Sequence, residues 1–281
     1  MAVSAVSDVL NVAAGLLGCP RCGQILDVGA APVRCPAGHS FDPARQGYLN
    51  LLGAASPPHA DTAAMVAARE RVLASGVFDP LDDLLGSLLT SRTRLLDAGG
   101  GTGHHLARAL DRLPDAYGVS VDISVAAARR AARAHPRLAS VVADTWAPLP
   151  IRTGAMDAVL CVFAPRNPEE FARVLTADGA VVVVTPEADH LVSVRSAHGL
   201  LGIEAGKADR LLRTMRGTLA LAERHRVCAD LDAGPDLVAD LIAMGPNAFH
   251  RSTGPTAGLR TRLAVTVWVF RKAAAGASPR R

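Results

Sequence analysis

The sequence predicts an α/β protein in which helices cover both faces of a parallel sheet and a small cysteine-rich module precedes that sheet. Short apolar segments alternate with helical segments from Thr93 onward, which is the pattern of βαβ units. Four glycines in five residues follow the first apolar segment, and three of the five cysteines lie within seventeen residues of one another. A chain of 281 residues is long enough for one full α/β domain and a smaller appendage.

The composition is that of a globular protein, with 49% hydrophobic and 20% charged residues. The formal net charge of +4 is compatible with a polyanionic partner but does not require one. No apolar run approaches the ~20 residues that a membrane helix needs, so we expect no membrane partner. Residues 1–18 lack the basic start of a secretory signal, and we expect an N-terminal tail or a short helix there. Cysteines clustered beside a histidine favour a reducing, cytoplasmic location.

Four potential metal ligands lie in the first part of the chain, in the pattern Cys-x2-Cys-x12-Cys-x3-His. Three thiolates and one imidazole can surround a zinc ion as a closed tetrahedron, which is the usual composition of a structural site. A catalytic zinc would keep one position open for water, and four good ligands leave none. We therefore predict one structural zinc ion in a module spanning residues 19–55, held by Cys19, Cys22, Cys35 and His39. A redox pair is the alternative.

A helical linker is predicted over residues 56–92, between the cysteine module and the sheet. Just before it, residues 40–52 mix aromatic, basic and amide side chains, which either stack on unpaired bases or form the small core beneath the module. The second interpretation is the plainer one. A cap at Thr62 begins a first helix, and a second helix follows Phe78. Phe78 lies where this linker can fold over a ligand of the sheet.

The sheet domain is predicted over residues 93–272, and a C-terminal tail over residues 273–281. Its first three strands end near Gly99, Asp122 and Asp144. The other expected elements are helices over 104–113, 124–134, 168–175 and 235–244, and strands over 156–163, 180–185, 219–232 and 263–270. We expect the last two strands to close the sheet in antiparallel orientation.

The glycine-rich turn after the first strand is the centre of the predicted site. A chain tolerates this density of glycine where its backbone passes very close to another group or adopts positive φ. In open α/β sheets that group is often a nucleotide-like ligand at the carboxyl ends of the strands. A tight turn without any ligand is the plainer alternative.

Carboxylates stand at the ends of three successive strands: Asp97, Asp122 and Asp144. An anionic Asp97 directly before the turn would repel the pyrophosphate of a dinucleotide, although an NAD-dependent dehydrogenase is the competing interpretation. The same charge suits a cationic ligand, and S-adenosylmethionine carries a sulfonium and an ammonium group and no phosphate. Asp122 lies about where a ribose-binding carboxylate belongs. These charges favour S-adenosylmethionine as the cofactor.

Together the three acids resemble the site of the seven-stranded, Rossmann-like class I methyltransferases. In that fold the first acid and the glycines hold the methionine end of the cofactor, the second acid binds the ribose hydroxyls, and the third lies near the adenine. The resemblance implies cofactor contacts from Asp97, Gly99, Gly101, Thr102, Gly103, Asp122 and Asp144.

An arginine stripe lies between the fifth and sixth strands, formed by Arg210, Arg213 and Arg216 at a spacing of three residues. On a helix these side chains share one face. Such a stripe can track phosphates, but a solvated helix face is the commoner explanation.

The combination of motifs is similar to the RlmA family, whose members are 23S rRNA guanine-N1 methyltransferases acting on the loop of hairpin 35. The similarity covers roughly Cys19 to Phe270, and it includes the zinc module. It also rests on Gly47-Tyr48-x-Asn50-Leu51-Leu52, on Phe163-Ala164-Pro165, and on Thr185-Pro186 followed by His190-Leu191. The chain resembles most the branch that confers resistance to tylosin-type macrolides, which implies nucleotide 748 as the target.

The resemblance also assigns roles to individual residues. It implies that the zinc ribbon helps to recognise RNA, and that Phe78 and His190 contact the cofactor. Two positions depart from the family pattern, because Gly100 stands where many relatives carry cysteine and Phe78 where some carry tyrosine. Neither change removes a charge that the cofactor needs.

The chemistry of guanine N1 requires loss of a proton, because the lone pair that attacks the methyl group becomes available only as that proton leaves. Candidates for the base are His190, the loop 163–167 and His250. Arg166 is a candidate for stabilising the negative charge that develops on O6, and Phe249 for stacking on a flipped guanine. We predict Arg166 and His250 as the catalytic residues.

Two other functions stay open at this level. One is a zinc-ribbon methyltransferase that acts on a protein or a small molecule. The other is a non-catalytic rRNA-binding factor with a methyltransferase fold. The sequence also leaves a homodimer open.

Overall fold

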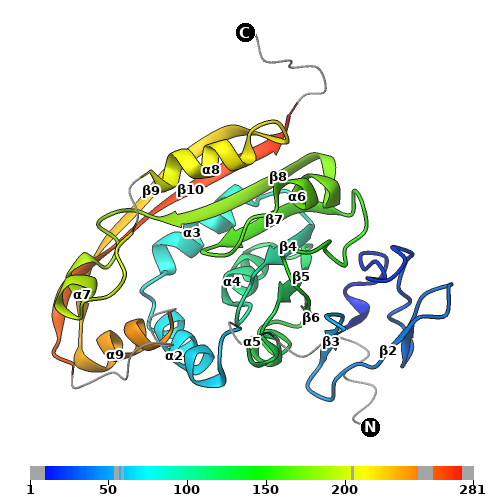
Figure 1. Cartoon of the computed structure of the whole chain (residues 1–281), viewed down its shortest axis with the longest axis horizontal. Helices are drawn as coiled ribbons and strands as arrows, with labels where there is room; N and C mark the ends of the chain where they lie inside the picture. Colours follow the sequence, from blue (N-terminus) through cyan, green and yellow to red (C-terminus); the bar gives the residue numbers. More distant parts are fainter. Residues whose placement is uncertain (1–9, 54–56, 58–59, 204–205, 246–255, 274–281) are drawn as a thin grey trace.

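The computed structural model describes residues 10–53, 57, 60–203, 206–245 and 256–273. A single eight-stranded sheet runs through it in the order β3-β6-β5-β4-β7-β8-β10-β9 (Figure 1). The strands are β3 (Tyr48–Asn50), β4 (Arg94–Ala98), β5 (Tyr117–Asp122), β6 (Leu138–Val142), β7 (Met156–Val162), β8 (Leu175–Pro186), β9 (Leu219–Ala233) and β10 (Leu259–Lys272). Neighbours from β3 to β8 are parallel, and β10 is antiparallel to both β8 and β9.

Seven of these strands are the ones predicted for the sheet domain, and the antiparallel closing strands are confirmed. The eighth strand, β3, comes from the segment that follows the cysteine module. It pairs in parallel with β6, Tyr48 opposite Ser140. Tyr48 is buried against Ala128 and Ala132, so its ring belongs to the core of the large sheet and is not available to stack on a base.

Eight helices of the described residues surround the sheet: α2 (Ala63–Ala74), α3 (Asp79–Leu88), α4 (His104–Arg112), α5 (Val125–Ala131), α6 (Pro168–Val174), α7 (Val192–Ala197), α8 (Lys207–Met215) and α9 (Pro235–Ala243). Successive residues of a strand point to opposite faces, and β4 shows how two cores arise. Leu95 packs into a cluster with α2, α3, α4, α7 and α9. Leu96 packs into a second cluster with α6, α8 and the N-terminal module. In the part of the chain that the structure describes, no helix is both long and apolar enough to cross a membrane.

The cysteine module contains a two-stranded sheet, β1 (Val33–Arg34) and β2 (Ser40–Phe41), and it is joined closely to the large sheet. Leu17 forms a β-bridge with Ile151, and the Gly18 N–H donates to the Pro150 carbonyl at 3.0 Å. From Leu10 onward, the segment predicted as a tail is packed into the shared core. The reason is its apolar content, which is buried against the loop that follows β6.

Candidate active site and metal centre

The four predicted metal ligands meet at one point of the N-terminal module. Their ligand atoms all lie within 4.8 Å of one another. Cys22 Sγ is 3.7 Å from Cys35 Sγ, and His39 Nδ1 is 3.5 Å from Cys19 Sγ and 3.4 Å from Cys35 Sγ. Tetrahedral zinc with bonds of ~2.3 Å to sulfur and ~2.0 Å to nitrogen separates its ligands by about 3.5–3.8 Å. The four residues therefore fit a closed zinc site.

A crevice for a ligand is expected where the strand order of a parallel sheet reverses. In this sheet the reversal occurs at β4, which has β5 on one side and β7 on the other. The carboxyl ends of β4, β5 and β6 carry the three predicted acids, and the ends of β7 and β8 lie across the reversal. The three predicted acids and the glycine turn therefore lie at one edge of the sheet.

The glycine turn packs tightly against its surroundings. Gly99, Gly101 and Gly103 have positive φ values of 78°, 56° and 75°. A Cβ atom on Gly99 would collide with the side chain of Ala164, and one on Gly100 would lie 2.7 Å from Asp97 Oδ2. Gly100 is therefore needed for space in this chain, whatever relatives carry there.

Asp97, just before the glycine turn, is unusual for a carboxylate in its burial and its lack of hydrogen bonds. Its side chain is 1% exposed, and neither carboxylate oxygen has a hydrogen-bond partner among the described residues. Burial, and to a smaller extent the neighbouring Asp122, raise the pKa of Asp97 to about 7. A buried carboxylate with no partner is costly, so this position is suited to a ligand that brings a positive charge.

Asp122 and Asp144 are held differently. Asp122 accepts hydrogen bonds from the backbone N–H groups of Gly101 and Ser124, each at 2.8 Å, which join the end of β5 to the glycine turn. Burial raises the pKa of Asp122, and these two hydrogen bonds oppose the shift. Asp144 lies just beyond β6, where its Oδ1 accepts from the Trp146 N–H at 2.9 Å. Each carboxylate keeps acceptor capacity for a hydroxyl or amino group of a ligand.

Arg69 also lies beside the glycine turn, a position that the sequence did not predict. It projects from α2 so that a Cβ atom on Gly101 would lie 3.3 Å from its Nη1. An ion pair with Asp61 (2.5 Å) and a hydrogen bond from Nη2 to the Met244 carbonyl (2.9 Å) hold it over the turn. A guanidinium at this place can pair with a ligand carboxylate. Nothing in the sequence near Arg69 indicates a ligand, because it is one arginine in an ordinary helix.

Three rings meet near the end of β7, the strand that follows β4 in the sheet order. Phe163 lies between Phe78, whose ring centroid is 6.1 Å away, and His190, whose centroid is 5.8 Å away. Phe78 also meets His105 edge to face at 6.0 Å. Phe78 and His190, both predicted as cofactor contacts, therefore each contact the ring of Phe163, which was not predicted as a binding residue.

The hydrogen bonding of His190 argues against its use as a base. Its Nδ1 accepts from the Ala264 N–H at 3.3 Å, which leaves the proton of the neutral ring on Nε2. Burial, and then the nearby Arg195, lower the pKa of His190 to about 4. The imidazole is therefore neutral near pH 7, and its free nitrogen is a hydrogen-bond donor.

Of the two predicted catalytic residues, Arg166 lies within the described residues. Arg166 is half-buried in the loop after β7, and its Nε has no hydrogen-bond partner among the described residues. His250 and Phe249 lie outside the described residues. Of the arginine stripe, Arg210 and Arg213 lie on α8 and Arg216 directly after it, all exposed.

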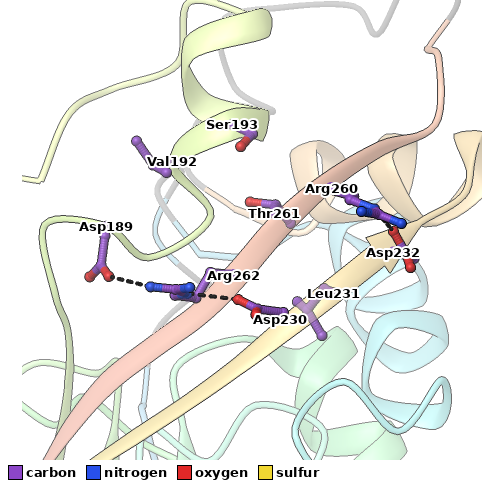
Figure 2. A pocket seen from close by; sticks show the side chains of 9 residues that line it. All are labelled: Asp189, Val192, Ser193, Asp230, Leu231, Asp232, Arg260, Thr261 and Arg262. Atoms are coloured by element: carbon purple, nitrogen blue, oxygen red, sulfur yellow. Dashed lines mark hydrogen bonds and ion pairs between the residues drawn. The ribbon is translucent and has the colours of Figure 1, made fainter.

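A cavity of about 440 Å³ is lined by residues from the segment 189–193, which includes His190, and by residues of β9 and β10 (Figure 2). Its charged side chains are paired with one another: Arg262 Nε donates to Asp230 at 2.8 Å and lies 3.8 Å from Asp189, and Arg260 pairs with Asp232 at 2.9 Å. The Leu191 N–H also donates to the Arg262 carbonyl at 2.7 Å. These contacts attach the His190 loop to β9 and β10. The ion-paired side chains around the cavity therefore hold that loop in place.

Two family models match the chain. The N-terminal domain model of RlmA, a zinc ribbon, matches residues 17–56, and a methyltransferase domain model matches residues 95–179. A chain from the solved complex between the Haloferax volcanii Trm112 methyltransferase activator and a methyltransferase has a TM-score of 0.51 at 16% identity, covering 75% of this chain and 97% of that chain. This likeness concerns the fold alone.

Three curated proteins are similar in sequence to this chain. A protein of Micromonospora griseorubida named as a 23S rRNA (guanine-N(1)-)-methyltransferase is 44% identical, over 90% of this chain and 95% of its own length. The 23S rRNA (guanine(748)-N(1))-methyltransferase of Streptomyces fradiae is 44% identical, over 84% and 86% of the two chains. YxjB of Bacillus subtilis, named for the same reaction, is 34% identical over 63% and 66%.

Proposed function

The chain belongs to the family of 23S rRNA (guanine-N1)-methyltransferases with an RlmA-type zinc ribbon, and from this premise we propose that it methylates N1 of guanine 748 in the hairpin 35 loop. The consequence is resistance to tylosin-type macrolides. We also propose that it acts in the cytoplasm on 23S rRNA. The domain division of the sequence analysis, with residues 19–55 contacting RNA and residues 93–272 carrying the reaction, is part of this proposal.

The observation that carries the proposal is the Asp97 carboxylate beside the glycine turn, which has no partner within the described part of the chain. S-adenosylmethionine supplies an electrophilic methyl group on a sulfonium when it is bound. Asp97 would accept from its ammonium group, and Arg69 would pair with its carboxylate. Asp122 and Asp144 would accept from the ribose and the adenine, and Thr102, Phe78 and His190 would complete the cofactor contacts.

The target base adds two requirements, a place for the N1 proton and compensation for charge on O6. Arg166 is proposed to stabilise the O6 charge, because its guanidinium stands at the end of β7 with Nε unpaired among the described residues. His250 is proposed to take the N1 proton. His190 is better suited to donate a hydrogen bond through Nε2.

The decisive experiment is methyl transfer from labelled S-adenosylmethionine to purified 23S rRNA, followed by mass-spectrometric mapping of the modified nucleotide. We expect one 1-methylguanosine at position 748. Label on protein or on small molecules, with none on RNA, would contradict the proposed substrate. Binding of rRNA without binding of S-adenosylmethionine by calorimetry would support the non-catalytic alternative.

Variants test the individual roles. Arg166→Ala and His250→Ala should each lower the rate of methyl transfer at saturating RNA, and unchanged rates in both would remove the catalytic assignment. Metal analysis should give about one zinc per chain. Cys22→Ser should lower RNA methylation more than it lowers cofactor affinity, because the ribbon is proposed to contact RNA and not the cofactor. Sedimentation of the purified chain tests the homodimer.

A further inference from the structure

Phe163 has a backbone conformation that a phenylalanine rarely adopts. It follows β7 directly and has a φ of +54°, in the left-handed region that favours glycine. Its side chain is 42% exposed, although the ring is large and apolar. Both features cost free energy, so they persist only where the surrounding structure enforces them or the function needs them.

The loop around Phe163 is held from several directions. The Phe163 N–H donates to the Val184 carbonyl at 3.3 Å, and the Cys161 thiol donates to the Pro165 carbonyl at 3.3 Å. Ala164 is buried beneath the glycine turn, where Gly99 has no room for a side chain. A glycine at position 163 would satisfy this backbone with less strain, so the aromatic ring itself requires an explanation.

The position of the ring indicates what it contacts. Phe163 stands at the end of β7, across the strand-order reversal from the acids that end β4 and β5. The carboxylates proposed to bind the cofactor lie on the β4 and β5 side of this reversal. Phe78 meets the Phe163 ring at an interplanar angle of 66° and His190 lies tilted at 35°, so two other rings hold it in place.

We propose that the exposed ring of Phe163 is the surface on which the target guanine stacks after it leaves the RNA loop. An unpaired purine presents a flat π-face, and aromatic side chains are the usual partners of bases that have left a stack. The ring stays partly exposed at the end of β7, where a base could reach it. Phe163 is thus a positioning residue for the base, and this inference rests on the proposed function.

The test uses an RNA hairpin of the loop 35 sequence. It compares three substitutions of Phe163 with one control variant. Phe163→Ala should lower kcat about tenfold to hundredfold, the usual range for loss of one base stack. The KM for RNA should change less than about threefold, because phosphate contacts dominate affinity. Phe163→Tyr should keep the wild-type rate within about threefold. Phe163→Gly should lower kcat as alanine does, and it should melt at a higher temperature than Phe163→Ala, since glycine adopts the positive φ without strain.

The matched control is Leu221→Ala, which removes another exposed apolar side chain (45% exposed) on β9. It should leave kcat, KM and cofactor affinity unchanged. In a second measurement, 2-aminopurine replaces the target guanine, and its fluorescence should be quenched by the wild type and by Phe163→Tyr, but not by Phe163→Ala.

Unchanged kcat and unchanged quenching in Phe163→Ala would overturn the inference. So would a parallel loss of S-adenosylmethionine affinity by calorimetry, because the ring would then be a cofactor contact. If the wild type methylated no RNA at all, the proposed function would fail instead, and the quenching measurement would still decide whether Phe163 receives a base.

Discussion

Two buried carboxylates lie in neighbouring regions of the molecule with opposite surroundings. Asp82 of α3 lies beneath the start of α4, and Asp97 ends β4; each is 1% exposed. Asp82 accepts from His105 Nδ1 at 2.6 Å and from His104 Nε2 at 3.0 Å. Asp97 has no partner among the described residues.

The difference appears in the protonation of the two groups. Burial would raise the pKa of Asp82, but the hydrogen bonds from His104 and His105 hold it well below its ordinary value. Burial raises the pKa of Asp97 to about 7, and nothing opposes the shift. Equal burial therefore does not separate a structural carboxylate from one that is proposed to bind a ligand. The hydrogen bonds that the protein itself supplies do separate them.

The largest effect is expected at Asp82. Asp82→Ala removes the acceptor shared by two half-buried histidines and leaves them unpaired, so the free energy of unfolding should fall by ~3–5 kcal/mol. Urea denaturation followed by circular dichroism measures it. A loss below about 1 kcal/mol would mean that the triad contributes little to the fold and that the contrast with Asp97 is wrong.

The second effect concerns cofactor affinity. Asp97→Asn should weaken binding of S-adenosylmethionine by about tenfold to hundredfold, the usual worth of a hydrogen bond to a charged group. The melting temperature without ligand should stay the same or rise, because a buried unpaired charge is removed. Calorimetry and thermal unfolding check the two parts. A variant that binds the cofactor normally, or that unfolds readily, would place Asp97 in the same class as Asp82.

The third effect is the pH dependence of cofactor binding. A cationic ligand binds the ionised form of Asp97, whose pKa in the free protein is about 7. Affinity should therefore fall as pH decreases below 7, by at most about tenfold per pH unit, and level off above it. The pKa of Asp97 in the folded protein lies above the ordinary 3.8, so this group lowers the free energy of unfolding as the pH rises from about 4 to 7. The pKa of Asp82 is lowered, so that group lowers the free energy of unfolding as the pH falls. A flat affinity profile between pH 5 and 8 would contradict the assignment.

The smallest effect is expected for a carboxylate at the surface. Asp232 pairs with Arg260, but the two side chains are 78% and 89% exposed. Asp232→Ala should shift the melting temperature by no more than about 1 °C, because exposed ion pairs contribute little. A shift of several degrees would indicate that the ion pairs around the cavity in Figure 2 stabilise the His190 loop strongly.

The zinc site and the acids of the crevice were predictable for the same reason. Cys19, Cys22, Cys35 and His39 lie within one short segment, where spacing alone limits how they can meet. The three acids occupy equivalent positions at the ends of successive parallel strands, and parallel strands bring their carboxyl ends to one edge. Alternating apolar and helical segments likewise predicted most strands and helices of the sheet domain, with differences of a few residues at their ends.

Other parts of the site depend on contacts between segments far apart in the chain. Residues 48–50 resembled a part of the zinc module, and their pairing with β6 follows from the docking of the module on the sheet. Arg69 reaches the glycine turn only because α2 packs against α5 and α9, and Asp82 meets His104 and His105 only because α3 packs against α4. No local pattern distinguishes these residues from others of their kind.

The sequence by itself determined the order of the elements, the zinc ligands and the row of acids, because period, spacing and strand-end position are properties of a local segment. The tertiary structure decided the rest. It alone showed that Asp97 lacks partners among the described residues while Asp82 has two, that His190 accepts at Nδ1, and that Phe163 presents a partly exposed ring in a strained conformation. Hydrogen bonding and burial depend on which distant segments pack together, and chain order does not specify those neighbours.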